Sequence, residues 1–129
     1  MTYSKTCPFC TLPTDRIVRE TQSALFIRDG FPISPGHTLV IPKRHVASFF
    51  ELTREEHKEM FELLTEAKVD LAKEFQPDAF NIGINDGAAA GQTVPHVHMH
   101  LIPRFKGDRA DPRGGVRWII PEKADYWTK

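Results

Sequence analysis

The sequence of 129 residues lacks three features that would indicate particular classes of protein. It has no long apolar run, so no segment is predicted to span a bilayer. It has no excess charge, because 17 Lys and Arg residues balance 17 Asp and Glu residues, which disfavours nucleic acid or membrane binding as the main activity. The first ten residues, MTYSKTCPFC, lack the apolar core of a signal peptide, so we expect a cytoplasmic location.

Cysteine is also scarce. The two cysteines, Cys7 and Cys10, form the pair CPFC. In a reducing compartment this spacing indicates metal binding or thiol redox chemistry more than a structural disulfide. A redox pair normally opens a helix after a strand, whereas this pair lies among prolines. We favour half of a zinc site, with incidental thiols and a redox pair as the alternatives.

The chain shows no repeat or low-complexity linker, and its length suits one domain covering residues 1–129. Thr53 and Glu56 have the spacing of a capping box. The apolar pattern that follows predicts one long helix of about 22 residues ending near Phe75. The side chains predicted to face the core are Met60, Phe61, Leu64, Ala67, Leu71 and Phe75.

Short segments rich in β-branched and aromatic residues lie between turn signals and are predicted to be strands. They cover residues 16–21, 24–27, 38–41, 79–84, 96–102 and 116–120, with Pro42 and Pro103 expected to end the third and the fifth. Strands outnumber the one long helix, and no crossover helices alternate with them. The pattern therefore predicts an α+β fold with a mostly antiparallel sheet.

Half of the six histidines fall within HVHMHLI, residues 96–102. Alternate residues of a strand face the same side, so His96, His98 and His100 would share one face at spacings of about 6.6 to 7 Å. The apolar residues between them would face the core. Each buried imidazole needs a hydrogen-bond partner, which makes chance clustering or simple core filling a weak explanation.

Two kinds of chemistry could use this row of imidazoles. Strand histidines can bind zinc, although three ligands would require the strand to curl until each lies about 2.0–2.1 Å from one ion. A neutral imidazole can instead attack phosphorus and form a covalent intermediate, while a neighbouring imidazole binds phosphate or moves a proton. We favour the nucleophilic chemistry.

The segment NDGAAAGQTVP precedes the histidines and offers small residues and backbone amides that could approach an anion. It lacks the Gly-Lys-Ser/Thr of a nucleotide triphosphatase loop. Alone, it could equally be a flexible loop. Next to three histidines, it favours a phosphate site.

GQTVPHVHMHLIPR resembles the signature of the histidine triad (HIT) superfamily, in which three histidines alternate with apolar residues. PGHTLVIPKRHV resembles a second family segment, and most of residues 7–104 can be laid along the family pattern. The resemblance implies a HIT-like fold with an antiparallel sheet of about five strands, one long helix and one short helix. It also implies a homodimer in which the sheet continues across both protomers.

The resemblance also implies catalytic roles. His98, the middle histidine, would be the nucleophile that attacks the α-phosphorus of a nucleotide. His100 would contact phosphate and help with proton transfer, and His37 would lie at the α-phosphate. Gln92 matches a side chain that orients the nucleophile or the leaving group.

Three further residues match substrate-binding positions of the family. Asn85 and Thr93 would contact phosphate. Asp29 would bind the ribose hydroxyls, and a carboxylate can accept hydrogen bonds from both.

The resemblance sharpens the expectation of zinc. Some family members hold a structural zinc with an N-terminal CxxC, the histidine after the Pro-Lys pair and the first histidine of the triad. Here these are Cys7, Cys10, His45 and His96, a set that suits a closed tetrahedral site. His45 alone could be an exposed loop histidine. No catalytic metal is expected.

The predicted function is hydrolysis of a dinucleoside polyphosphate such as diadenosine tetraphosphate at the α-phosphate, through a covalent nucleotidyl-histidine. The AGQTV and LIPR segments resemble that branch of the family. Asn85 resembles the purine nucleoside phosphoramidase branch, which is the alternative. A nucleotide-binding or partner-binding protein with little turnover is an alternative of another class.

Overall fold

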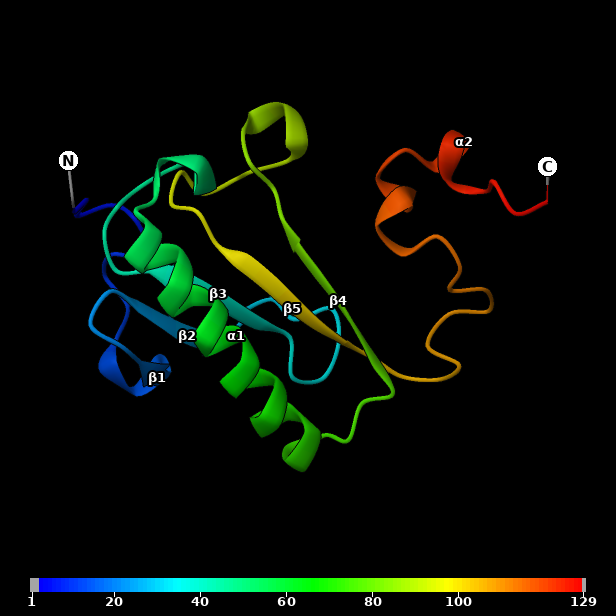
Figure 1. The fold of residues 1–129 in the computed structure, drawn as a ribbon, viewed down its shortest axis with the longest axis horizontal. Coiled ribbons are helices and arrows are strands. Elements are labelled where there is room, and N and C mark those ends of the chain that lie inside the picture. Colours follow the sequence, from blue (N-terminus) through cyan, green and yellow to red (C-terminus); the bar gives the residue numbers. More distant parts are fainter. Residues whose placement is uncertain (1–2, 129) are drawn as a thin grey trace.

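The computed structural model describes residues 3–128, whose centre is an antiparallel sheet with strand order β1-β2-β3-β5-β4 (Figure 1). Helix α1 crosses one face of this sheet, and the C-terminal segment lies beside β4 (Figure 1). This arrangement confirms the α+β prediction. The strands are β1 (Ile17–Glu20), β2 (Ala24–Arg28), β3 (Thr38–Pro42), β4 (Ala79–Ile84) and β5 (Met99–Arg104), and the helices are α1 (Arg54–Glu74) and α2 (Pro121–Ala124). Four 3-10 turns join them: η1 (Thr14–Arg16), η2 (Phe49–Glu51), η3 (Ala88–Ala90) and η4 (Gly115–Ile119).

Helix α1 has 21 residues and begins after the predicted capping box, in which Thr53 and Glu56 satisfy each other's backbone N–H groups. Its buried apolar side chains are Met60, Leu63, Ala67 and Leu71. Phe61 was predicted to be in the core, but it is 50% exposed. Leu63 takes its place because residues 60, 63, 67 and 71 form the continuous stripe at spacings of three and four.

The two faces of the sheet have different neighbours. Met99 and Leu101 of β5 pack with α1, together with Val97, which lies just before the strand. The opposite face carries a smaller cluster of Leu25, Ile27, Leu39 and Ile41, covered by Phe9, Leu12 and Ile17. Because strand residues alternate, His100, Ile102 and Arg104 face this second side, away from α1.

The fifth predicted strand has different limits from those expected. It begins at Met99, because the backbone N–H groups of His96 and Val97 donate to the loop carbonyls of Val94 and Val46 rather than to a neighbouring strand. It also continues through Pro103 to Arg104. β3 pairs with β5 only along residues 99–101, so proline at 103 removes no hydrogen bond to β3.

The predicted strand at residues 116–120 is wrong. Gly114 and Gly115 have positive φ angles of 94° and 47°, and a 3-10 turn covers Gly115–Ile119. Val116 and Ile119 are 60% and 81% exposed. β-branched residues favour a strand only where a neighbouring strand and a core can take them, and this segment has neither.

Two further expectations concern membrane spanning and the formation of a homodimer. Within the described residues, no helix is both long enough and apolar enough to cross a membrane. β4 forms one edge of the sheet, where a second copy could continue it. The homodimer stays a prediction.

Candidate functional site

Two groups of histidines lie on the sheet face opposite α1. The first, which we call the relay, consists of Asp29, His37 and His100. The second, the Cys–His cluster, consists of Cys7, Cys10, His45 and His96. His98 lies between them in the sequence. Its ring centroid is 5.3 Å from that of His100.

His98 is held in one orientation and one tautomer. Its Nδ1 lies 2.9 Å from the carbonyl oxygen of His96, which can only accept a hydrogen bond. Nδ1 must therefore carry the proton, and Nε2 has the free lone pair. Within residues 3–128, no hydrogen-bond partner reaches this Nε2. Such an imidazole is prepared for attack on an electrophile.

The relay fixes the proton positions on two more imidazoles. The backbone N–H of Ile33 donates to His37 Nδ1 at 3.2 Å, so the neutral ring carries its proton on Nε2. This N–H lies 2.9 Å from His100 Nδ1 and 3.4 Å from Asp29 Oδ2. His100 Nδ1 accepts the bond, which leaves the His100 proton on Nε2. His100 therefore has an N–H donor on Nε2, in a ring that neighbours the ring of His98.

Burial favours the neutral forms of the two histidines of the relay. The pKa of His100 is lowered to about 4, first by burial and then by the neighbouring His98 and His37. Burial also lowers the pKa of His37, although Asp29 opposes this effect. A neutral His100 can donate through Nε2 without placing a permanent positive charge in the site. Protonation of His100 Nδ1 would place two N–H groups against each other and break its bond to His37.

This shift predicts a loss of folding stability in acid. The ordinary histidine pKa is 6.5, so between pH 6.5 and about 4 the unfolded chain binds more protons at residue 100 than the folded chain. The contribution of His100 is complete above pH 6.5 and disappears as the pH falls towards 4. The upper limit is about 3 kcal/mol, reduced by the solvent that reaches the ring.

The measurement is urea unfolding of the wild type and His100→Gln at pH 7, 5.5 and 4.5. Glutamine retains an amide at this position but does not titrate. The free energy of unfolding of the wild type should fall more steeply with acid than that of the variant. Equal pH dependence in both proteins would contradict the prediction.

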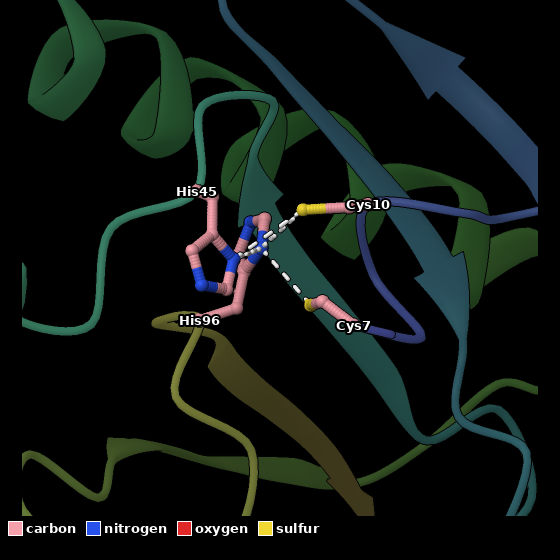
Figure 2. A group of neighbouring side chains, drawn as sticks. All are labelled: Cys7, Cys10, His45 and His96. Atoms are coloured by element: carbon pink, nitrogen blue, oxygen red, sulfur yellow. Dashed lines mark hydrogen bonds between the residues drawn. The ribbon is translucent and has the colours of Figure 1, made fainter. Parts of the chain in front are cut away.

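The four side chains of the Cys–His cluster point toward one another (Figure 2). His45 Nδ1 and His96 Nδ1 are 3.3 Å apart, and three S···N distances are 3.3, 3.5 and 3.6 Å. A zinc ion bound at about 2.05 Å to nitrogen and 2.3 Å to sulfur would separate two nitrogens by about 3.3 Å and a nitrogen and a sulfur by about 3.6 Å. The donor atoms therefore fit one ion, and both cysteines are free thiols.

The surroundings of His96 support the same conclusion. Its Nε2 donates to the carbonyl oxygen of Pro42 at 2.7 Å, which leaves the Nδ1 lone pair facing both thiols and His45. A backbone carbonyl on the second nitrogen is the usual way to orient a metal-binding histidine. Burial lowers the pKa of His96 and raises that of the Cys10 thiol. A bound cation would stabilise the thiolates that burial alone disfavours.

Phe9 is a site residue that the sequence did not reveal. It stands between the two cysteines, and its ring lies edge-on to His98 and His96 at centroid distances of 5.0 and 5.8 Å. Its position within CPFC carried no signal, because the contact depends on how the N-terminal segment folds over the sheet. His98 is therefore in contact with two residues of this region, through the ring of Phe9 and the carbonyl oxygen of His96.

The loop before the triad is braced internally. The Gln92 amide accepts from the backbone N–H of Gly87 at 2.8 Å and donates to the carbonyl oxygens of Ala47 and Val94. Asp86, which the sequence did not single out, accepts from Ser48 Oγ and the backbone N–H of Phe49. In this structure, Gln92 holds the loop in shape. Its predicted contact with substrate stays a prediction.

The predicted substrate-binding residues are placed differently from one another. Asn85 and Thr93 are exposed, and neither side chain has a hydrogen-bond partner among the described residues. Asp29 instead joins the relay, and its Oδ1 accepts from the backbone N–H of Phe31 at 2.8 Å. The structure therefore brings Asp29, His37, His98 and His100 together and leaves Asn85 and Thr93 on the surface.

Comparison with known proteins gives a consistent result. The HIT domain family matches residues 12–107. The bis(5'-nucleosyl)-tetraphosphatase [asymmetrical] of Schizosaccharomyces pombe is 51% identical over 77 residues, which cover 60% of this chain and 42% of that protein. The bis(5'-adenosyl)-triphosphatase of Saccharomyces cerevisiae is 32% identical over 117 residues, covering 90% of this chain and 54% of that protein. The chain thus spans about half of the length of these two relatives.

A solved structure resembles the fold of this chain and contains zinc. It is a zinc-bound histidine triad family protein from Mycobacterium smegmatis, which is 34% identical to this chain. The TM-score is 0.73, and the match covers 82% of this chain and 80% of that one.

Proposed function

The chain belongs to the HIT domain family, and we propose that it hydrolyses a dinucleoside polyphosphate through a covalent nucleotidyl-His98 intermediate. The observation that carries this proposal is the tautomer of His98. Its Nδ1–H is bound to the carbonyl oxygen of His96, which leaves the Nε2 lone pair free, and its ring centroid lies 5.3 Å from that of His100. This pair combines a nucleophile with a donor for a phosphate oxygen, as substitution at phosphorus requires.

The reaction divides into two displacements. In the first, His98 Nε2 forms a bond to the α-phosphorus, and the bond from phosphorus to the bridging oxygen breaks. The electron pair leaves with the second nucleotide, and the Nδ1 proton remains bound to the carbonyl oxygen of His96. In the second, water attacks the same phosphorus, the bond from phosphorus to Nε2 breaks with its electron pair returning to Nε2, and one proton of the water passes to the solvent, which releases a nucleoside monophosphate and the neutral His98.

The relay contributes a hydrogen-bond donor that keeps its proton through both displacements. His100 Nε2–H can hydrogen-bond a non-bridging oxygen throughout both displacements, because His37 supplies its Nδ1 with a hydrogen bond. Asp29 keeps a lone pair of its carboxylate for the ribose hydroxyls while it holds His37. Asn85 and Thr93 have unengaged side chains that can turn toward the phosphates, and Gln92 holds the shape of their loop.

Zinc in the Cys–His cluster would have a structural role. Cys7, Cys10, His45 and His96 would fill all four tetrahedral positions, which leaves none for substrate or water. The zinc-bound relative from Mycobacterium smegmatis supports this assignment. When bound, the ion would hold the thiolates together and fix the N-terminal segment on the sheet. We also retain the homodimer and the cytoplasmic location as proposals.

The test offers three compounds to the purified protein: diadenosine triphosphate, diadenosine tetraphosphate and adenosine 5'-phosphoramidate. We expect the dinucleotides to be cleaved to adenosine monophosphate and the remaining nucleotide, measured by chromatography of the products. Preferential cleavage of the phosphoramidate would favour the second candidate, a purine nucleoside phosphoramidase, to which Asn85 points. If none of the three is cleaved but nucleotides bind, the protein is a binding protein and the proposed hydrolase is wrong.

A further inference from the structure

A cavity of about 570 Å³ lies between β5 and the C-terminal segment, outside the histidine site. A volume of several hundred Å³ suits a nucleoside-sized ligand. Its residues come from the end of β5 and from residues 109–127. They are Arg104, Arg109, Ala110, Asp111, Pro112, Gly115, Trp118, Asp125 and Trp127.

This cavity opens on the same side of the sheet as the nucleophile. Arg104 follows His100 and Ile102 along the face of β5 that points away from α1. Arg104 Nη1 donates to Asn81 Oδ1 at 2.7 Å, and a Cβ added at Gly115 would lie 3.1 Å from Asn81 Nδ2. The C-terminal segment therefore packs over this end of the catalytic face. Arg104 lies four positions after His100 along the strand, a distance of about 13 Å.

The surface between the two sites has no side chain protruding from it at Gly83. Gly83 is the cross-strand partner of His100, and a Cβ at Gly83 would meet no atom within 4 Å. Asn81 is the partner of Ile102 and lies next to the cavity wall. Because Gly83 has no side chain, an extended ligand can run from the histidine site along β4 and β5 without a steric obstacle at this position.

The cavity combines groups that suit a nucleoside with phosphate attached. Trp118 is 46% exposed and offers an indole face to a base. Trp127 is held by the guanidinium of Arg113, whose carbon lies 4.9 Å from the ring centroid. Asp111 and Asp125 also line the cavity, but Arg113 and Thr128 already bind their carboxylates, so we assign them no contact with the ligand.

One cation at the cavity is available for phosphate. The guanidinium of Arg104 is already occupied by both oxygens of Asp108 and by Asn81, so it forms a wall rather than a binding group. Arg109 is exposed, and its guanidinium has no hydrogen-bond or ion-pair partner among residues 3–128. Asp111 is held by Arg113 in a bidentate pair, which reduces its repulsion of an anion.

We propose that this cavity binds the second nucleoside of the substrate, the half that leaves when His98 attacks. This inference rests on the proposed hydrolase function and adds a substrate class to it. Trp118 stacks on the distal base, Arg109 contacts the phosphate next to it, and the intervening phosphates run along β5. The cavity therefore favours dinucleotides over substrates that end just beyond the scissile bond.

The test compares two substrates with the same first nucleoside: diadenosine tetraphosphate and the p-nitrophenyl ester of adenosine monophosphate. The variants are Trp118→Ala, Trp118→Phe and Arg109→Ala. Stacking of one base contributes about 1–3 kcal/mol, so Trp118→Ala should lower the ratio of kcat/KM between dinucleotide and ester by about tenfold. Arg109→Ala should lower the same ratio severalfold, and Trp118→Phe should restore most of it.

The control is Arg54→Ala, which removes an exposed arginine at the start of α1, on the other side of the sheet. It should leave the ratio unchanged. Wild-type turnover of both substrates, with equal losses on both in the Trp118 and Arg109 variants, would overturn this inference alone. Wild-type turnover of neither would overturn the proposed function, and the inference with it.

Discussion

Replacing His98 by alanine is expected to lower kcat on a dinucleoside polyphosphate by about 10³-fold or more, because it removes the attacking atom itself. His98 is 8% exposed, and its Nδ1 is bound to a backbone oxygen, so only Nε2 is available to the substrate. Neighbouring groups do not replace it. His100 presents a proton at its free position, and the His37 nitrogens are both engaged.

The measurement has two parts. Steady-state rates compare the wild type with His98→Ala and with His57→Ala, in which the lost imidazole belongs to α1 and donates from Nε2 to the carbonyl oxygen of Phe49. His57→Ala should retain activity. Rapid quenching under alkaline conditions, followed by mass spectrometry, should show one nucleoside monophosphate attached to the wild type and none on His98→Ala. An adduct on another residue, or an active His98→Ala protein, would contradict the mechanism.

The histidine motif shows how far the sequence could be interpreted. Alternation correctly separated His100 from the core residues Met99 and Leu101, because the period of a strand is fixed by backbone geometry. Alternation did not reveal that the strand begins only at Met99. That limit depends on the carbonyls of Val46 and Val94, which bind the preceding N–H groups. Contacts between distant segments have no local pattern in the sequence.

The same distinction explains the relay and Phe9. The sequence brought His37 and Asp29 to the site only through a family resemblance, which does not specify proton positions. The hydrogen bond from Ile33 to His37 assigns those positions and makes His100 a donor. Phe9 lies 89 residues from His98, and only the folded N-terminal segment brings the two rings together. The sequence could therefore propose residues that carry chemistry, but it could not predict the residues that orient them.

Removing the Cys–His cluster should have the second large effect, on stability first and on activity through it. We expect Cys7→Ser and Cys10→Ser to lose bound zinc and to lower Tm by about 10 °C or more, because a closed site contributes its binding free energy to the folded state. The loss also frees Phe9 and the backbone of His96, which hold the ring of His98. kcat should therefore fall in the variants even at temperatures where they remain folded.

Metal analysis and thermal unfolding test this coupling. The wild type should contain about one zinc per chain, because the four ligands complete one tetrahedral site, and a chelator should lower its Tm toward that of the cysteine variants. The same chelator should leave the Tm of Cys10→Ser unchanged. Thr11→Ala is a matched control, since it removes a hydrogen bond to the Cys7 carbonyl but no ligand. Zinc retained by Cys10→Ser, or its absence from the wild type, would remove the cluster as a metal site.

Phe9→Ala then separates the effect on stability from the effect on activity, because it keeps every ligand but removes the ring from His98. A variant that binds zinc normally yet turns over slowly would show that the N-terminal segment acts on the nucleophile through this contact.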